Sequence, residues 1–361
     1  VGKTGNYLLL LEGATANDPA KTASYDFSFN RVPDLFAALN TGNAVSGSIA
    51  TAGQSTVYTF DLTTAARLVF DFQTNNSSLL WSLRGPRGAE ITDRAFTGSD
   101  ASGGLSVLSL PAGSYQLTVR GSGRTTGAYA FRVLEAAAAT PFTLGTAVTG
   151  SLIPGNATHL YSVTVAAGDR LAFDSLSVAG GSATWRLVDS YGRDAVGSNN
   201  LATDKSAFLL KTPGTYTLLV EGALANTAPV DYSFQLNFVD NVPQPALPDG
   251  DPMVVGEVVT GYLDTKGTSK VYRFTLEQDS VLVFDNQTNS SAFKWSLTGP
   301  RGQEVAPRYL TQSDSTGGDP ALVLVAGEYA LTVTASDGTG AYAFQLLDPA
   351  SFPEIMLDEQ T

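Results

Sequence analysis

The stretch FDFQTNNSSLLWSLRGPRGAE, residues 70–90, decides the fold because this chain contains it twice. The near-identical FDNQTNSSAFKWSLTGPRGQE occupies residues 284–304, and a more divergent version, FDSLSVAGGSATWRLVDSYGRD, occupies residues 173–194. Recurrence of a long segment along one chain is typical of repeated structural units. The chain is therefore expected to be an array of modules.

Three further anchors recur in the same order. A tryptophan recurs at 81, 185 and 295, and an early-strand tyrosine recurs at 58, 161 and 272. A late hairpin starts as PAGSYQLTV, TPGTYTLLV or VAGEYALTV and closes as AYAFRV, DYSFQL or AYAFQL. The early-strand tyrosines are 103 and 111 positions apart, which indicates a module of about 105 residues. The predicted modules span residues 41–135, 145–240 and 256–348.

The first 32 residues contain only the late hairpin, in GNYLLLLEGATANDPAKTASYDFSF, and resemble the middle module most. The first and third modules share the GPRG motif that the middle module lacks. This order indicates that a pair of modules of about 210 residues was duplicated. Residues 1–32 are thus predicted to be a partial module, and residues 349–361 the start of a next linker. The alternative is that the early hairpin caps the first module.

Each module is predicted to be all-β. In VYTFDL, Tyr58, Phe60 and Leu62 alternate with more polar residues, as in a half-buried strand. Turns are indicated by PAG, TPG, RGPRG and SDGTG, because glycine permits positive φ and proline presets φ. No convincing helical period exceeds two turns. The prediction is about eight strands per module, in two antiparallel sheets packed face to face as a jelly-roll-like β-sandwich.

Composition restricts the partners and the location. The 361-residue chain has a formal net charge of −13 and no basic run, so phosphate backbones and anionic membranes would repel it. Only 15% of its residues are charged, it has no cysteine, and no apolar run is long enough to cross a bilayer. We expect no nucleic-acid partner, no membrane insertion, and an extracellular or cell-surface location.

The order of these motifs resembles that of bacterial pre-peptidase C-terminal-like domains. The shared elements are the glycine-rich first strand, the early-strand tyrosine, the AG-x-Y hairpin and the final Y-x-F. The resemblance implies jelly-roll-like sandwiches of the kind found in secreted proteases and in giant extracellular repeat proteins. The family's common aspartates before the early tyrosine are missing, and its aspartate-rich segment is replaced by WSLRGPRG, WRLVDSYG and WSLTGPRG. The resemblance therefore implies a calcium or ligand site only near Asp189.

The sequence offers little material for catalysis. His159 is the only histidine, and we interpret it as a surface strand residue beside Leu160 on the core face. Without a cysteine, a second histidine or a G-x-S-x-G motif, the chain has almost none of the material that hydrolase triads and metal-hydrolase sites need. Carboxylate pairs for glycoside hydrolysis stay open. The prediction is a protein that is not an enzyme and has no catalytic or cofactor-binding residues.

Aromatic residues and loop aspartates are the two kinds of candidate binding residue in the sequence. The three tryptophans could stack on sugars, but their register with strands favours a shared core anchor. Tyr191, Tyr262 and Tyr309 are not repeated between modules, and are candidates for surface binding. The weak calcium candidates Asp100, Asp314 and Asp319 lie in loops that resemble ordinary turns, and Asp189 is a fourth. These loops have few carboxylates for calcium, so no metal or cofactor is expected.

The leading hypothesis is an extracellular structural or adhesive repeat protein, such as a segment of a bacterial stalk, surface layer or matrix filament. Its partners would be neighbouring modules and other copies of itself. The alternative is a carbohydrate- or matrix-binding accessory array of a larger secreted enzyme, with polysaccharide as partner, and a calcium-stiffened spacer is a third hypothesis. Exposed tryptophans would favour the alternative, and buried ones the leading hypothesis. The short EAAAATPF linker predicts a tighter junction than the proline-rich VDNVPQPALPDGDPM linker.

Overall fold

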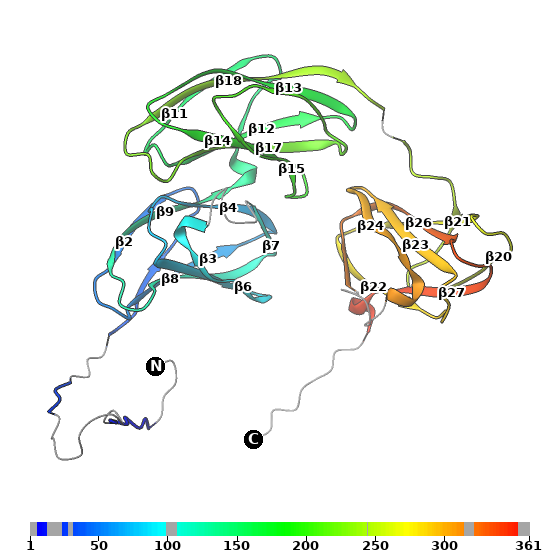
Figure 1. Ribbon diagram of the computed structural model, residues 1–361, viewed down its shortest axis with the longest axis horizontal. Helices are drawn as coiled ribbons and strands as arrows, with labels where there is room; N and C mark the ends of the chain where they lie inside the picture. Colours follow the sequence, from blue (N-terminus) through cyan, green and yellow to red (C-terminus); the bar gives the residue numbers. More distant parts are fainter. Residues whose placement is uncertain are drawn as a thin grey trace.

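Three β-sandwich modules follow one another along the chain (Figure 1). The computed structural model describes residues 6–12, 24–27, 32–98, 107–243, 245–313 and 321–352. Over these ranges the only helical elements are short 3-10 turns, and the remainder is strand, turn or irregular chain. The prediction of an all-β chain of sandwich modules is confirmed.

The first module contains strands β1 to β9 in two sheets. The five-stranded sheet has the order β1-β3-β8-β5-β6, and the four-stranded sheet has the order β2-β9-β4-β7. The strands are β1 Leu35–Ala38, β2 Ala44–Ile49, β3 Ser55–Leu62, β4 Ala66–Phe72, β5 Leu79–Gly85, β6 Gly88–Ala95, β7 Leu108–Leu110, β8 Gly113–Gly121 and β9 Gly127–Glu135.

The second module repeats this topology, with sheets β10-β12-β17-β14-β15 and β11-β18-β13-β16. Its strands are β10 Thr140–Pro141, β11 Ala147–Leu152, β12 Thr158–Val165, β13 Asp169–Ala179, β14 Ala183–Val188, β15 Asp194–Asn200, β16 Lys205–Leu209, β17 Gly214–Gly222 and β18 Val230–Asn241.

The third module also has the same two sheets, β19-β21-β26-β23-β24 and β20-β27-β22-β25. Its strands are β19 Asp251–Pro252, β20 Val258–Leu263, β21 Ser269–Leu276, β22 Ser280–Asn286, β23 Phe293–Gly299, β24 Gly302–Tyr309, β25 Ala321–Leu324, β26 Gly327–Ala335 and β27 Gly340–Leu347.

One detail of the sheets differs from the prediction of purely antiparallel pairing. The first strand of each module (β1, β10 and β19) pairs in parallel with β3, β12 and β21 respectively. These short strands come from the linkers and lie at a sheet edge. The prolines of β10 and β19 lack an amide hydrogen, which an edge position tolerates because the sheet interior keeps all its hydrogen bonds. The sandwiches therefore include linker residues ahead of the motifs that define the repeat.

The two chain ends bear on the predicted partial module and the predicted next linker. The described residues of the first segment, 6–12 and 24–27, are exposed and are not assigned to strands. The other residues of the predicted hairpin, and residues 353–361 of the predicted linker, lie outside the described residues. The hairpin therefore stays a prediction.

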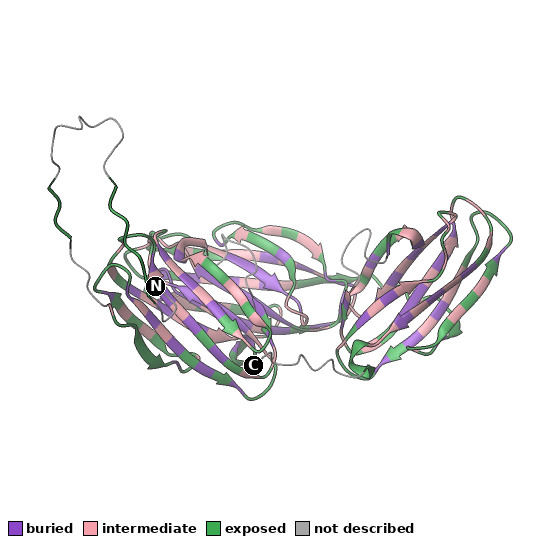
Figure 2. Ribbon diagram, turned by 90° about the horizontal axis from the view of Figure 1, so that it is seen from below, coloured by how far each residue is buried: buried purple, intermediate pink, exposed green. Residues whose placement is uncertain are grey.

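Each module has its own hydrophobic core between its two sheets, and the strands alternate between buried and exposed residues (Figure 2). The repeated tryptophan lies at the centre of each core. Ring centroids of Phe173 and Trp185 are 4.2 Å apart, and those of Phe284 and Trp295 are 3.9 Å apart. Stacked aromatic pairs of this kind add to the large apolar area that each ring buries.

The repeated GPRG motif ties the two sheets of a module together. Arg87 pairs with Glu90 at 2.7 Å, and its Nη2 also donates to the carbonyl of Ser109 in β7. Arg301 makes the same contacts in the third module, with Glu304 at 2.7 Å and the carbonyl of Val323. The motif thus has a structural role in both modules.

A glycine in the first strand of each four-stranded sheet is explained by a pair of tyrosines. Tyr58 and Tyr129 share a hydrogen bond of 2.8 Å between their hydroxyl oxygens, as Tyr161 and Tyr232 do at 2.6 Å. The Tyr129 ring lies directly over Gly47, so a Cβ at that position would overlap the ring. Only glycine allows this close approach.

Candidate functional site at the junction of the first two modules

Besides the three cores, the described residues form a smaller apolar cluster between the first two modules. Val69 and Val107 of the first module pack against Val188 and Leu219 of the second in a separate buried cluster. Val69 lies between Leu68 and Phe70 on β4, so it points away from the core of its own module. The outer face of β2-β9-β4-β7 therefore meets the outer face of β10-β12-β17-β14-β15.

A buried carboxylate lies beside this apolar contact. Asp71 on β4 is 0% exposed and forms an ion pair with Arg132 of β9 at 2.8 Å. The same carboxylate accepts hydrogen bonds from the backbone amide of Thr158 at 3.3 Å and from its hydroxyl at 3.2 Å. Arg132 in turn donates to the Thr158 carbonyl at 2.9 Å. Asp71 therefore links the two modules through contacts whose geometry is specific.

A second ion pair is buried on the second module's side of the junction. Glu221 of β17 and Arg186 of β14 are 3% and 2% exposed and are joined at 3.1 Å. Burial raises the pKa of Glu221 to about 7, against the opposing effect of Arg186, and the Asp71 and Asp194 carboxylates add to the rise. Burial likewise raises the pKa of Asp71, although Arg132 opposes the shift.

These carboxyl groups make the junction sensitive to pH. The native pKa of Glu221 is about 7 and its ordinary value is 4.5, so between these values the folded chain holds a proton that the unfolded chain releases. The proton on Glu221 therefore stabilises the folded chain fully below pH 4.5. This contribution to the free energy of unfolding, at most about 3 kcal/mol, is lost as the pH rises through 7. Relative to wild type, a Glu221→Gln chain should become more stable as the pH rises from 5 to 7.5. Thermal melting at both pH values, with exposed Glu277→Gln as control, tests this, and an equal pH response in all three chains would contradict it.

A cleft of about 660 Å³ opens at the same junction and is lined by residues of both modules, including Arg132, Glu135 and His159. His159 is half-buried, and its Nδ1 lies 2.8 Å from the hydroxyl of Tyr232, which also bonds Tyr161. Burial and the nearby Arg132 lower the pKa of His159, so the ring is neutral near pH 7.

The structure corrects the sequence interpretation of this strand. His159, predicted to lie at the surface, shares the inward side of β12 with Tyr161. Leu160, predicted to face the core, packs at the junction instead. The error arose because the outward side of β12 is itself covered by the neighbouring module.

The three tryptophans are 0–1% exposed, so their interpretation as core anchors is confirmed. The tyrosine candidates lie apart from one another. Tyr262 is 69% exposed on β20, whereas Tyr309 donates to Asp337 at 2.8 Å and lies under Lys294. Tyr191 is half-buried beside Arg193. They do not form a common surface.

The predicted calcium candidates divide in two. Asp100, Asp314 and Asp319 lie outside the described residues. The Asp189 carboxylate accepts hydrogen bonds from the amides of Tyr191 and Arg193 and forms an ion pair with the Arg193 guanidinium at 2.8 Å. Its oxygens thus stabilise the turn before β15. Among the described ranges, no cluster of three or more His, Cys, Asp or Glu side chains could hold a metal ion.

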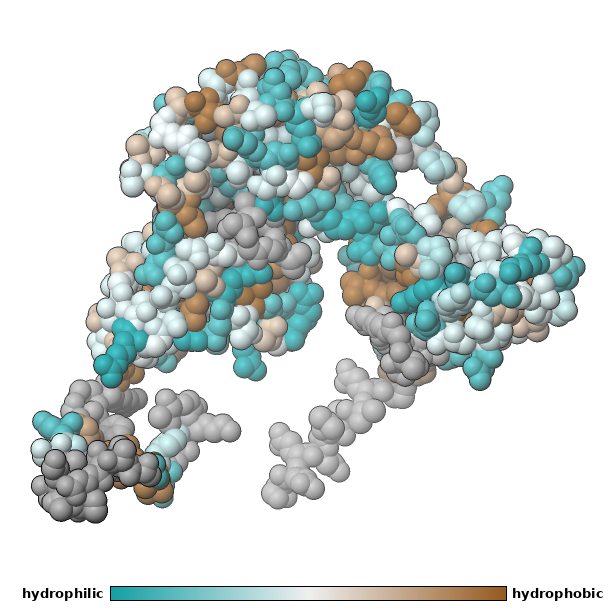
Figure 3. Space-filling model, in the orientation of Figure 1, coloured by the Kyte–Doolittle hydropathy of each residue, from teal (hydrophilic) through white to brown (hydrophobic). Residues whose placement is uncertain are grey.

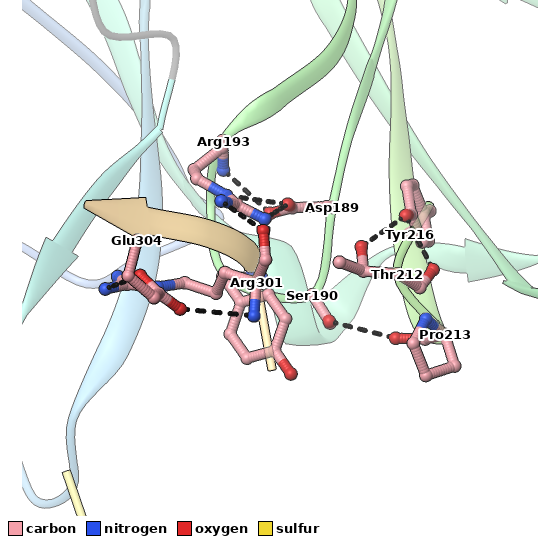
Figure 4. A network of polar contacts seen from close by, with 9 residues as sticks. Asp189, Ser190, Arg193, Thr212, Pro213, Tyr216, Arg301 and Glu304 are labelled. Atoms are coloured by element: carbon pink, nitrogen blue, oxygen red, sulfur yellow. Dashed lines mark hydrogen bonds and ion pairs between the residues drawn. The ribbon is translucent and has the colours of Figure 1, made fainter. Parts of the chain in front are cut away.

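The second and third modules are joined by fewer contacts. The Nη1 of Arg193 donates to the carbonyl of Arg301 at 3.0 Å, which connects the Asp189 turn to the Arg301–Glu304 pair (Figure 4). No buried hydrophobic cluster combines described residues of these two modules. The expected difference between the tight first junction and the looser second one is therefore observed.

Sequence reasoning missed the residues that form the first junction. Their signal lies in the outward positions of the five-stranded sheets. Leu219 of the second module corresponds to Thr118 and Thr332 in the other two, and Val188 corresponds to Arg84 and Thr298. Apolar residues at positions that are polar in the sister modules could have revealed the buried face.

Comparisons with known proteins do not name the chain. No protein-family model matches it, and no curated protein matches its sequence, so the resemblance to pre-peptidase C-terminal-like domains stays a prediction. One similar solved structure is the CUB1-EGF-CUB2 domain of human MASP-1/3, with 8% identity, a TM-score of 0.18, and coverage of 55% of this chain and 99% of that one. A triple-jelly-roll protein of an archaeal virus turret matches with 10% identity, a TM-score of 0.18, and coverage of 85% and 82%.

A third similar structure is the M60 catalytic domain with the CBM51-1 and CBM51-2 domains of Clostridium perfringens ZmpB. It matches with 10% identity, a TM-score of 0.19, and coverage of 85% of this chain and 55% of that one. The fold assignment rests on the sheets of the chain itself. In the part of the chain that the structure describes, no helix has the length and apolar character needed to cross a membrane.

Proposed function

We propose that this chain is a structural segment of an extracellular repeat protein, such as a stalk, surface layer or matrix filament, and that it carries out no catalysis. The observation that supports this role is the buried junction between the first two modules. An apolar cluster together with the Asp71 contacts holds two sandwiches in one orientation. A pair of modules joined in this way resists bending, whereas a flexible tether would not need a covered interface.

The surface composition agrees with this role. Few residues carry charge, and in Figure 3 brown apolar side chains lie among teal and white ones on all three modules. Stacked modules that contact mainly their neighbours extend a chain without requiring a single large core. All three tryptophans are buried and so cannot stack on sugars, which supports the structural role over the carbohydrate-binding alternative.

Electron microscopy of the 361-residue chain, combined with a polysaccharide pull-down, tests the proposal. We expect particles in which the first two modules keep one relative orientation, while the third varies more. We also expect no retention on insoluble cellulose, chitin or peptidoglycan. Variable angles at the first junction would contradict the structural role. Saturable retention that is lost in a Tyr262→Ala chain would support the carbohydrate-binding alternative instead.

A further inference from the structure

The third module carries a second copy of the face by which the first module holds the second. Val69 and Asp71 of β4 correspond to Val283 and Asp285 of β22, which lie in the same two-residue spacing. In both modules the glutamine two positions after the aspartate donates to its Oδ2, at 2.9 Å from Gln73 and 3.1 Å from Gln287. The hydrogen bond between the glutamine and the carboxylate is thus retained.

Among the described residues, those on this face of the third module are more exposed than their counterparts in the first. Val283 and Asp285 are partly exposed, whereas Val69 and Asp71 are 1% and 0% exposed. Val281 and Val323, beside them on β22 and β25, are 45% and 66% exposed, where the first module has Arg67 and Ser109. These branched apolar residues lie on an edge strand and the strand next to it and form an exposed patch. Covering such a patch with another module would be favourable.

The second module shows that such a face is not a general property of this fold. At the corresponding positions of its four-stranded sheet, β13 carries Ala172 and Asp174, and β18 carries Gln235 and Asn237. Asn237 donates to Asp174 at 2.6 Å, so the polar groups satisfy one another in the absence of a partner. The docking face therefore belongs to the first and third modules, which also share the GPRG motif.

The connecting turn is repeated as well. After β9, the 3-10 turn Ala136–Ala138 leads directly into the second module, and after β27 the 3-10 turn Pro349–Ser351 occupies the same position. We propose that the outer face of the β20-β27-β22-β25 sheet is a docking surface for a second copy of the middle module, residues 140–241, presented by another part of the same repeat array. The Val188 and Leu219 side chains of that copy would cover Val283, and its Thr158 amide and hydroxyl would bond Asp285.

One of the differences between the two faces removes the charge partner of the aspartate. The position of Arg132, which neutralises Asp71, is occupied in the third module by Gln345, whose amide donates to the Gly256 carbonyl. Asp285 would therefore be covered without a guanidinium partner, at some cost in affinity. A Gln345→Arg chain should accordingly bind the middle module more tightly than the wild type does.

This inference rests on the proposed role as a segment of a repeat array, and a cysteine probe tests it without reference to polysaccharide. The chain has no cysteine, so Val283→Cys introduces a unique thiol. The acceptor is residues 1–348 carrying this cysteine, followed by a second copy of residues 136–241, which reproduces the spacing of the first junction. In this acceptor the thiol should react with a maleimide at most about one tenth as fast as in the 361-residue chain carrying the same cysteine.

Matched variants identify the contact. Leu347→Glu, at the position of Leu134, should restore fast labelling, while Thr332→Glu on the opposite sheet should leave the thiol protected. Gln345→Arg should slow labelling further. Equal labelling rates with and without the added module, when circular dichroism shows that module folded, would overturn the proposal.

A second experiment covers the case in which the added module does not fold. The Val69→Glu substitution should release the middle module from the first module within a full chain. This chain is mixed in excess with the Val283→Cys chain. Protection of the thiol that rises with the concentration of the released chain supports docking. No protection at any concentration, with the released chain still folded by circular dichroism, overturns it. Retention on a polysaccharide would contradict only the proposed structural role. The thiol-labelling result tests only the docking surface.

Discussion

A Trp295→Ala chain is expected to lose the stability of its third module while the first two modules remain as stable as before. Trp295 is 1% exposed and stacks on Phe284, so its removal leaves a large cavity at the centre of one core. Truncations of this kind cost about 3–5 kcal/mol. In a domain of about 100 residues each kcal/mol lowers the melting temperature by roughly 4–8 °C. Differential scanning calorimetry should therefore show one transition moved far down and the others unmoved.

The matched substitution in the first module should behave differently. Trp81 is also 1% exposed and stacks on Phe70, so the local cost in free energy is expected to be similar. The first module, however, shares a buried cluster with the second, so loss of its fold would expose Leu219 and Val188. We expect Trp81→Ala to lower the melting temperature of the second module as well. Independent transitions for all three modules in both variants would contradict the coupling inferred from the first junction.

The fold could be predicted from the sequence to the extent that burial within a module governs it. The Tyr58, Phe60 and Leu62 alternation and the repeated tryptophans face the cores that the pattern predicted. Such positions are decided by the two-residue period of a strand and by side-chain size, and both can be read without neighbours. The short parallel strand at the start of each module was missed because it comes from the linker ahead of the repeated motifs and contains only four residues in β1 and two in β10 and β19.

The candidate site could be predicted only in part, because it depends on contacts between modules. Asp71 is an ordinary acid in the pattern of a half-buried strand, and only the approach of Thr158 from 87 positions away makes it a buried linking group. His159 was placed on the wrong side for the same reason, since Leu160 is apolar on account of a neighbouring module and not of its own core. A comparison of outward positions between sister modules would have separated these two causes.

A Leu219→Asp chain is expected to lose the first junction altogether. Leu219 is 0% exposed within the cluster that joins the two modules, and the new carboxylate would lie near the buried Asp71 and Glu221. Burying an unpaired charge among apolar groups costs more than 3 kcal/mol in most proteins, and like charges nearby add to the cost. The modules should separate instead of burying the charge, because each has a core of its own. Small-angle X-ray scattering should then show a larger radius of gyration than for the wild type.

The third module provides the matched control for this substitution. Thr332 on β26 occupies the position of Leu219 but is only half-buried and belongs to no buried cluster among the described residues, so Thr332→Asp should change stability by about 0.5 kcal/mol or less. A Leu219→Asp chain that scatters like the Thr332→Asp chain would mean that the apolar cluster does not hold the modules together. If separation occurs while each module keeps its own melting transition, the junction is an interface between preformed domains. If the second module unfolds on separation, the pair is instead one cooperative unit, and the duplicated pair is the unit of folding as well as of sequence.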